Sequence, residues 1–298
     1  MRKILLINIC IILSCSSFAQ KGNQKLIAEY EDTLTIIANK ITHGATEKEK
    51  KEANEAFIKN LTEVLSYSKS FKFSFDKLPP TISRIISPKK NFRIFTWFIQ
   101  KDDKSYTYYG VLHYYNKKDK RYKIIKLTDK SNHIRNAKNK ELKPENWYGA
   151  YYYDIIYIKN KKKEFYTLLG FNGYDRYSSK KIIDIMHFNT EGEIVFGLPI
   201  FNNAAQKKEK RKRIILEHDA KTFINVKYDK EQRRIIFNHL SPPSKDLAGL
   251  EEYYIPDGTF DSYNYKKEEW WLMENIDIRT EKDQIKEIKK IDKGLIPR

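Results

Sequence analysis

From about residue 90 to residue 274, apolar residues recur at every second position, and short polar turns interrupt them at regular intervals. This pattern is typical of β-hairpins, because successive side chains of a strand point to opposite faces of a sheet. Five predicted hairpins follow one another: Phe92–Ile99 with Tyr106–Tyr115, Tyr151–Ile158 with Phe165–Phe171, Ile182–Phe188 with Ile194–Gly197, Phe223–Tyr228 with Arg233–Phe237, and Thr259–Tyr265 with Trp270–Glu274. Further strands are predicted over Arg121–Leu127 and Arg213–Glu217. We therefore expect a large antiparallel meander, arranged as a sandwich, a barrel or a propeller-like array.

Helical periodicity precedes these strands. Apolar residues at three- and four-residue spacing predict a first helix that ends at Gly44. Thr46 and Glu49 form a capping box at the start of a second helix. A short basic helix is predicted over Thr280–Ile291. The predicted fold class is therefore mainly β, with an N-terminal α-hairpin and a short C-terminal helix.

The first nineteen residues predict export. Arg2 and Lys3 precede a short apolar stretch over Ile4–Leu13, and small residues then precede a cleavage site after Ala19. An alternative is a lipoprotein anchored through Cys15, whose surroundings are close to a lipoprotein cleavage box. The other cysteine lies upstream, so a chain cleaved after Ala19 has no thiol for disulfides, catalysis or metal binding. The predicted divisions are a signal peptide over 1–19, a helical hairpin over 20–80, a β domain over 81–279 and a basic helix or tail over 280–298.

The chain is strongly basic, with 57 Lys and Arg against 39 Asp and Glu and a net charge of +18. Most of the basic residues are lysines in predicted turns, whereas proteins that read nucleic acid favour the bidentate fork of arginine. Export would also separate the chain from cellular nucleic acid. We therefore predict no nucleic-acid partner, no transmembrane span in the mature chain, and attraction to an anionic envelope surface as one possible consequence of the charge.

Candidate catalytic residues are few. His187, His218 and His239 each fall near the end of a predicted strand, and Asp175 and Asp184 lie nearby in the sequence. In a simple meander the three histidines would lie about 9.5 Å apart, too far for one metal ion. The sequence also contains no nucleotide-binding or hydrolase motif. We predict no metal and no cofactor, and a hydrolase that uses these acidic and histidine side chains is an alternative function.

Aromatic residues are the more informative group. Tyr106, Tyr108, Trp147, Tyr151 and Tyr153 belong to segments with rings on both faces of a predicted strand. If one face is core, the other can expose rings to a glycan or a peptide, unless the helical hairpin covers it. These five residues are the predicted ligand-binding residues of a non-enzymatic binding or envelope-associated module.

Several segments resemble those of a known group of proteins. They are Ser87–Trp97, Tyr166–Gly173, Lys181–Asp184, Phe196–Phe201 and Pro256–Asp261. Together they resemble a family of uncharacterised secreted proteins of Gram-negative bacteria, over most of residues 85–278. The resemblance implies an exported setting, a periplasmic or cell-envelope location and no known activity or catalytic residue.

Overall fold

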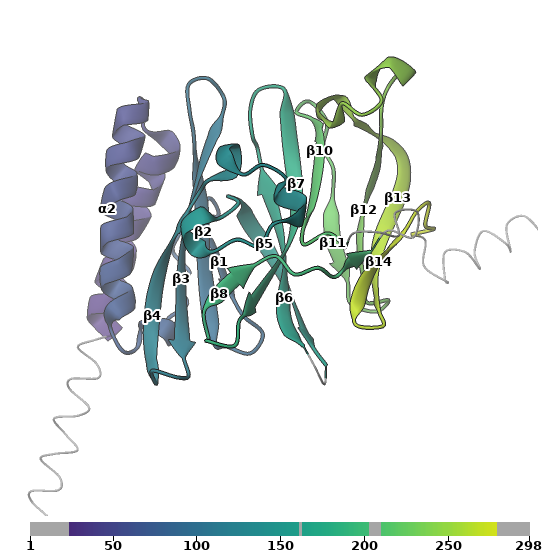
Figure 1. Ribbon diagram of the computed structural model, residues 1–298. Coiled ribbons are helices and arrows are strands. Elements are labelled where there is room, and N and C mark those ends of the chain that lie inside the picture. Colours follow the sequence, from purple (N-terminus) through teal and green to yellow (C-terminus); the bar gives the residue numbers. More distant parts are fainter. Residues whose placement is uncertain (1–23, 161–162, 203–209, 279–298) are drawn as a thin grey trace, which may run out of the picture.

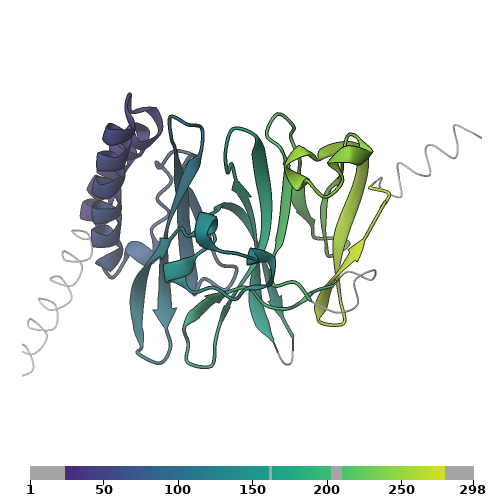
Figure 2. The ribbon, with the colours of Figure 1, turned by 45° about the horizontal axis from the view of Figure 1, so that its top comes forward.

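Four layers stack side by side in the protein: a helical hairpin and three β-sheets (Figure 1). The same order of layers is seen in the rotated view of Figure 2. The structure, a computed structural model, describes residues 24–160, 163–202 and 210–278. The predicted signal peptide and the predicted helix over Thr280–Ile291 lie outside the described residues.

The helical hairpin consists of a first helix over residues 24–43 and α2 (Glu47–Ser66). The predicted capping box is confirmed, because the backbone N–H of Glu49 donates to Oγ1 of Thr46 at 3.1 Å. The apolar faces of the helices lie against the first sheet, where the indole N–H of Trp97 donates to Oδ1 of Asn54 at 2.7 Å. Within the described ranges, neither helix is both long and apolar enough to cross a membrane.

The strands form three separate sheets. The first contains β1 (Ser83–Ile86), β2 (Phe92–Gln100), β3 (Tyr106–Asn116) and β4 (Arg121–Thr128), in that order. The second contains β5 (Tyr151–Lys159), β6 (Glu164–Asn172), β7 (Ser178–Phe188), β8 (Ile194–Phe196) and β10 (Ile214–Asp219), in the order β10-β7-β6-β5 with β8 also on β7. The third contains β9 (Phe201–Asn202), β11 (Val226–Asp229), β12 (Arg234–Ser241), β13 (Ile255–Lys266) and β14 (Glu269–Met273), in the order β11-β12-β13-β14-β9. Short 3₁₀ helices are η1 (Ser70–Lys72), η2 (Ser131–His133), η3 (Ala137–Asn139), η4 (Pro144–Asn146), η5 (Lys245–Leu247) and η6 (Glu251–Tyr253).

The predicted mainly β fold with an N-terminal α-hairpin is confirmed, and each of the five predicted hairpins forms an antiparallel pair. They do not form one continuous meander or a closed barrel, because the chain leaves one sheet to begin the next. β10 returns to pair with β7, and β9 joins β14 as a parallel pair. One strand is also shorter than predicted: β11 begins at Val226, so Phe223 lies in the connection between β10 and β11.

Three apolar cores fill the spaces between the layers. The core between the helices and the first sheet includes Phe57, Leu61, Trp97 and Val111. The core between the first and second sheets includes Tyr108, Trp147, Tyr152 and Leu168. The core between the second and third sheets includes Phe165, Ile183, Phe237 and Trp270. The first and second sheets are therefore covered on both faces, and their side chains reach solvent mainly at sheet ends and edges.

Candidate functional site

Two of the five predicted ligand-binding residues are buried. Tyr108 is 2% exposed and Trp147 is 0% exposed, both in the core between the first and second sheets. The hydroxyl of Tyr108 accepts from the backbone N–H of Gly173 at 2.6 Å, and the indole N–H of Trp147 donates to the hydroxyl of Tyr152 at 3.0 Å. The prediction for Tyr108 and Trp147 is thereby corrected. The second sheet, and not the helical hairpin, covers this face of the first sheet.

The other three predicted residues lie together near the end of the second sheet that is uppermost in Figure 1, beside the β6–β7 turn. We call this surface the aromatic ledge, and it comprises Tyr106, Tyr151, Tyr153, Phe171, Lys181 and Phe223. Phe223 is 74% exposed and Tyr153 is 38% exposed, while the other members are half-buried. Sequence reasoning missed Phe171, Lys181 and Phe223 as site residues.

Strand pairing brings the ledge together. Phe171 of β6 is paired with Tyr151 on one side and with Lys181 on the other. The ring centroid of Tyr106, at the start of β3, lies 6.5 Å from that of Phe171. Along β5, Tyr151 packs against the same core as Tyr152, with its ring centroid 6.1 Å from that of Phe98. Tyr153 lies at the irregularity between Tyr152 and Asp154, and its hydroxyl reaches Val226 of the third sheet. The result is a row of rings drawn from four segments of the chain.

Hydrogen bonds hold the three tyrosine rings in place. The hydroxyl of Tyr106 accepts from Nε2 of Gln100 at 2.8 Å. The hydroxyl of Tyr151 donates to the carbonyl of Pro80, and that of Tyr153 donates to the carbonyl of Val226 at 3.0 Å. Since the rings are already oriented, a ligand that stacks on them pays little entropy to order them.

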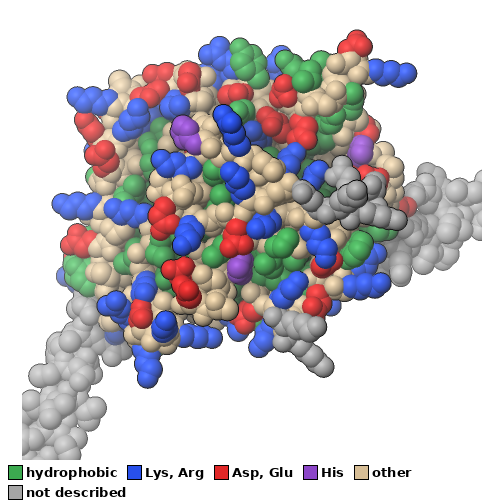
Figure 3. Space-filling view, in the orientation of Figure 1, with side chains coloured by type: hydrophobic (Ala, Val, Ile, Leu, Met, Phe, Trp, Pro, Cys, Tyr) green, Lys and Arg blue, Asp and Glu red, His purple; other side chains and the backbone are tan. Residues whose placement is uncertain are grey.

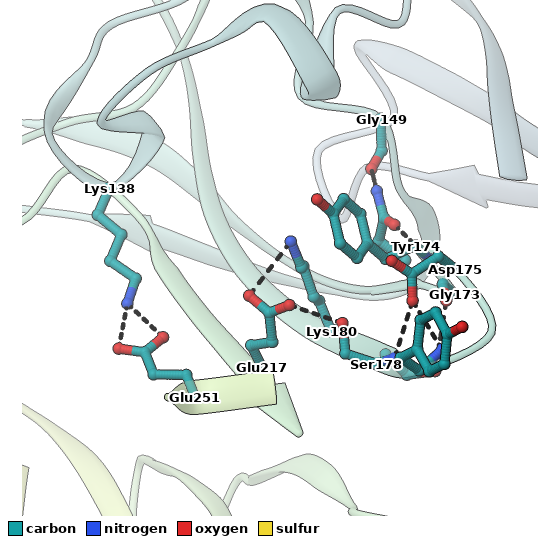
Figure 4. Close-up of polar contacts among 12 residues, drawn as sticks. Lys138, Gly149, Gly173, Tyr174, Asp175, Ser178, Lys180, Glu217 and Glu251 are labelled. Carbon is teal, nitrogen blue, oxygen red and sulfur yellow. Dashed lines mark hydrogen bonds and ion pairs between the residues drawn. The ribbon is translucent and has the colours of Figure 1, made fainter. Parts of the chain in front are cut away.

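Two consecutive lysines of β7 have contrasting surroundings. Nζ of Lys180 lies 3.2 Å from the carboxylate of Glu217 and 3.3 Å from the ring centroid of Tyr174. Glu217 also accepts from Oγ of Ser178 at 2.6 Å, and Figure 4 shows these contacts beside the ion pair of Lys138. Lys180 and Glu217 are opposite each other in the β7–β10 pair, and Ser178 is only 1% exposed, so this cluster links the two strands and offers no open nucleophile.

Lys181 has aromatic neighbours in place of an anion. Its ammonium nitrogen lies 5.2 Å from the ring centroid of Tyr153, 5.3 Å from that of Phe171 and 5.5 Å from that of Phe223. Within the described part of the chain, no carboxylate forms an ion pair or a hydrogen bond with it. Burial lowers the pKa of Lys181, and no nearby negative charge offsets this effect.

The candidate catalytic carboxylates have structural roles. Asp175 accepts from the backbone N–H groups of Tyr177 and Ser178, at 2.7 and 3.0 Å, and so closes the β6–β7 turn. Asp184 and Arg213 form an ion pair in which both side chains are 0% exposed, with Nε 3.1 Å from Oδ1. Burial raises the pKa of Asp184, and the charge of Arg213 opposes the rise. Asp184 is therefore closed to a substrate.

The three candidate histidines lie apart. The sequence-based argument assumed a partner strand between those of His187 and His218, but β10 pairs directly and antiparallel with β7. His218 lies opposite Ser179, eight residues along β7 from His187, which corresponds to about 27 Å at the usual rise of a strand. His239 lies in the third sheet, where Nδ1 is 2.8 Å from Oδ2 of Asp261. Among the residues that the structure describes, no three His, Cys, Asp or Glu side chains are grouped so as to hold a metal ion.

A hollow lies at the opposite end of the first and second sheets. It consists of two adjoining cavities of about 500 and 590 Å³ between the β3–β4 and β7–β8 turns, with Tyr114 and Tyr115 in its lining. The amide oxygens of Asn116 and Asn189 accept from backbone N–H groups of their own turns. Because these polar groups already have partners, the groove offers fewer convergent contacts to a ligand than its volume suggests.

Charge does not single out a site on the face drawn in Figure 3. Lys and Arg side chains are interspersed there with Asp and Glu.

Comparison of the chain with protein-family models, curated proteins and solved structures gives no significant match. The family resemblance therefore stays a prediction, and the geometry of the aromatic ledge has to carry the functional argument.

Proposed function

We propose that the chain is an exported protein of the periplasm or cell envelope that binds a carbohydrate, without catalysis, on the aromatic ledge. Export rests on the sequence of residues 1–19. Binding rests on one observation above all. The exposed rings of Phe223 and Tyr153 flank the same ammonium group, next to three half-exposed rings.

A carbohydrate fits this surface better than a compact apolar ligand does. Aromatic side chains offer a flat apolar area with a polar tip, which suits a ligand that has both CH and OH groups. Phe223 and Tyr153 present their rings at the surface, whereas ligands with few polar groups favour deep apolar pockets. The fixed orientation of Tyr106, Tyr151 and Tyr153 adds to the likeness to a preformed stacking platform.

The positions of the candidate catalytic Asp and His side chains support a function without catalysis. Asp184 is enclosed by its ion pair with Arg213, and Asp175 is engaged in a turn. His187 and His218 lie near opposite ends of β7. The hydrolase alternative needs several of these groups around one substrate, and over residues 24–160, 163–202 and 210–278 the five candidate side chains do not come together beside the ledge.

The test is binding of the purified protein to a panel of immobilised glycans, with three single variants. We expect Phe223→Ala and Tyr153→Ala each to weaken binding by about tenfold, the usual loss for a central aromatic contact. Tyr115→Ala is the matched control, because Tyr115 is also 38% exposed but lies at the other end of β3, in the lining of the groove. Loss of binding in Tyr115→Ala alone, or binding to no glycan, would contradict the proposal.

A further inference from the structure

We infer that the carbohydrate bound on the aromatic ledge carries a carboxylate, and that this carboxylate pairs with Lys181. The inference rests on the proposed function and names the class of its ligand: an acidic polysaccharide of the uronic-acid type. It adds a specific charge to a surface that would otherwise recognise sugars by stacking alone.

The surroundings of Lys181 carry the inference. Three ring centroids lie within 5.5 Å of its ammonium nitrogen, so aromatic surface replaces much of the water around the charge. Cation–π attraction offsets part of this loss of hydration. An opposite charge is the usual partner of a partly buried cation, yet the described residues supply none at this position.

The neighbouring Lys180 of the same strand has both an anionic and an aromatic partner. Its ammonium group contacts the carboxylate of Glu217, and the ring of Tyr174 covers it. Lys181 has the rings but lacks the carboxylate. A ligand carboxylate placed among Tyr153, Phe171 and Phe223 would complete around Lys181 the arrangement that Lys180 already has.

A single carboxylate suits this position better than a phosphate. Lys181 is the only charged member of the ledge, and lysine acts as a point charge without the bidentate fork that matches phosphate. Burial lowers the pKa of the neighbouring His218 and the charge of Lys181 also lowers it, while the hydrogen bond with the backbone of Asp219 opposes the fall; the net shift favours the neutral imidazole. One positive charge therefore meets one negative charge.

The experiment compares two probes by isothermal titration of the full purified protein. The probes are an oligogalacturonate and the same oligosaccharide after reduction of its carboxyl groups. We expect the acidic probe to bind at least about tenfold more tightly, as for a hydrogen bond to a charged group. Lys181→Gln should abolish this preference, and Lys181→Arg should keep it because the charge remains.

Lys159→Gln is the matched control, since Lys159 is an exposed lysine at the far end of β5 and its loss changes the net charge equally. This variant should keep the preference for the acidic probe. Equal binding of both probes, with loss in Phe223→Ala, would overturn the inference and leave the proposed function standing. The inference would also be overturned if Lys181→Gln still preferred the acidic probe, or if the wild-type protein bound neither probe. In the latter case the panel of immobilised glycans tests the proposed function separately.

Discussion

Replacing Arg213 with methionine would leave Asp184 as a buried carboxylate without a counter-charge. Both side chains are 0% exposed, and Nε of Arg213 lies 3.1 Å from Oδ1 of Asp184. Nη1 of Arg213 also donates to the carbonyl oxygens of Ala137 and Lys140. The single change Arg213→Met thus removes an ion pair and two hydrogen bonds that tie the start of β10 to the segment around η3.

We expect the free energy of unfolding of Arg213→Met to fall by roughly 3–5 kcal/mol, the range for removing one partner of a buried ion pair. That is a large part of the total stability of an ordinary domain, about 5–15 kcal/mol. The measurement is urea unfolding at pH 7, followed by tryptophan fluorescence. The four-layer fold supplies the reason for the size of the effect, because water cannot reach Asp184 between the first and second sheets.

The loss should depend on pH. In the variant, burial still raises the pKa of Asp184 and the opposing charge of Arg213 is gone. A carboxyl whose pKa is raised in the folded state does not lower the unfolding free energy at pH values below its unfolded-state pKa of about 3.9. It lowers the unfolding free energy increasingly as the pH rises from there toward the folded-state pKa. The difference in unfolding free energy between the wild-type protein and Arg213→Met should therefore shrink when the pH is lowered from 8 to 5.

The double variant Arg213→Met, Asp184→Leu is the control. Replacing both members of a buried pair by apolar residues of similar volume is often close to neutral, so the double variant should recover most of the lost stability. The reasoning is refuted if Arg213→Met unfolds within about 1 kcal/mol of the wild-type protein, or if the double variant is no more stable than the single one.

Three further outcomes are expected, two from single contacts and one from the N-terminal sequence. Asn54→Ala would leave the buried indole N–H of Trp97 without an acceptor, so the free energy of unfolding in urea should fall by about 1–3 kcal/mol, and an unchanged value would contradict the contact. Burial alone would lower the pKa of His239, but its hydrogen bond to Asp261 and the nearby carboxylates raise it. The stability that this gives is present below about pH 6.5 and is lost as the pH rises through the folded-state pKa. Between pH 6 and 8, the wild-type protein should therefore lose more unfolding free energy than His239→Gln, and an equal loss would contradict the contact. The intact mass of the exported protein should correspond to a chain that starts at Gln20, whereas a diacylated N-terminal cysteine would show a lipoprotein.

The sequence was sufficient to predict the local elements but not their assembly. The capping box at Thr46 and the polar turns between strands act within a few residues, so the helices and all five hairpins could be predicted. The division into three sheets depends on pairings between distant strands, such as β10 with β7 and β9 with β14. A pattern of alternating residues does not reveal which strand edge another strand will join.

The same limit applies to the candidate site. Alternation places Tyr108 and Tyr106 on one face, but only the stacking of the second sheet buries Tyr108 and leaves Tyr106 at the end of the layer. The signal for Phe223 was present in the alternation, because Ile224 and Val226 are the buried residues of that segment and Phe223 has the opposite parity to both. Lys181 could not be found in the sequence, since its surroundings come from three segments that are distant in the chain.

The most direct test of the central claim is hydroxyl-radical footprinting of the full protein with and without oligogalacturonate. Aromatic side chains react according to their exposure, so the measurement reports the ledge itself. We predict that the ligand protects Tyr153 and Phe223 and leaves Tyr115, which is as exposed as Tyr153, unchanged. Protection of Tyr115 in the groove without protection of Tyr153 and Phe223 would contradict the account.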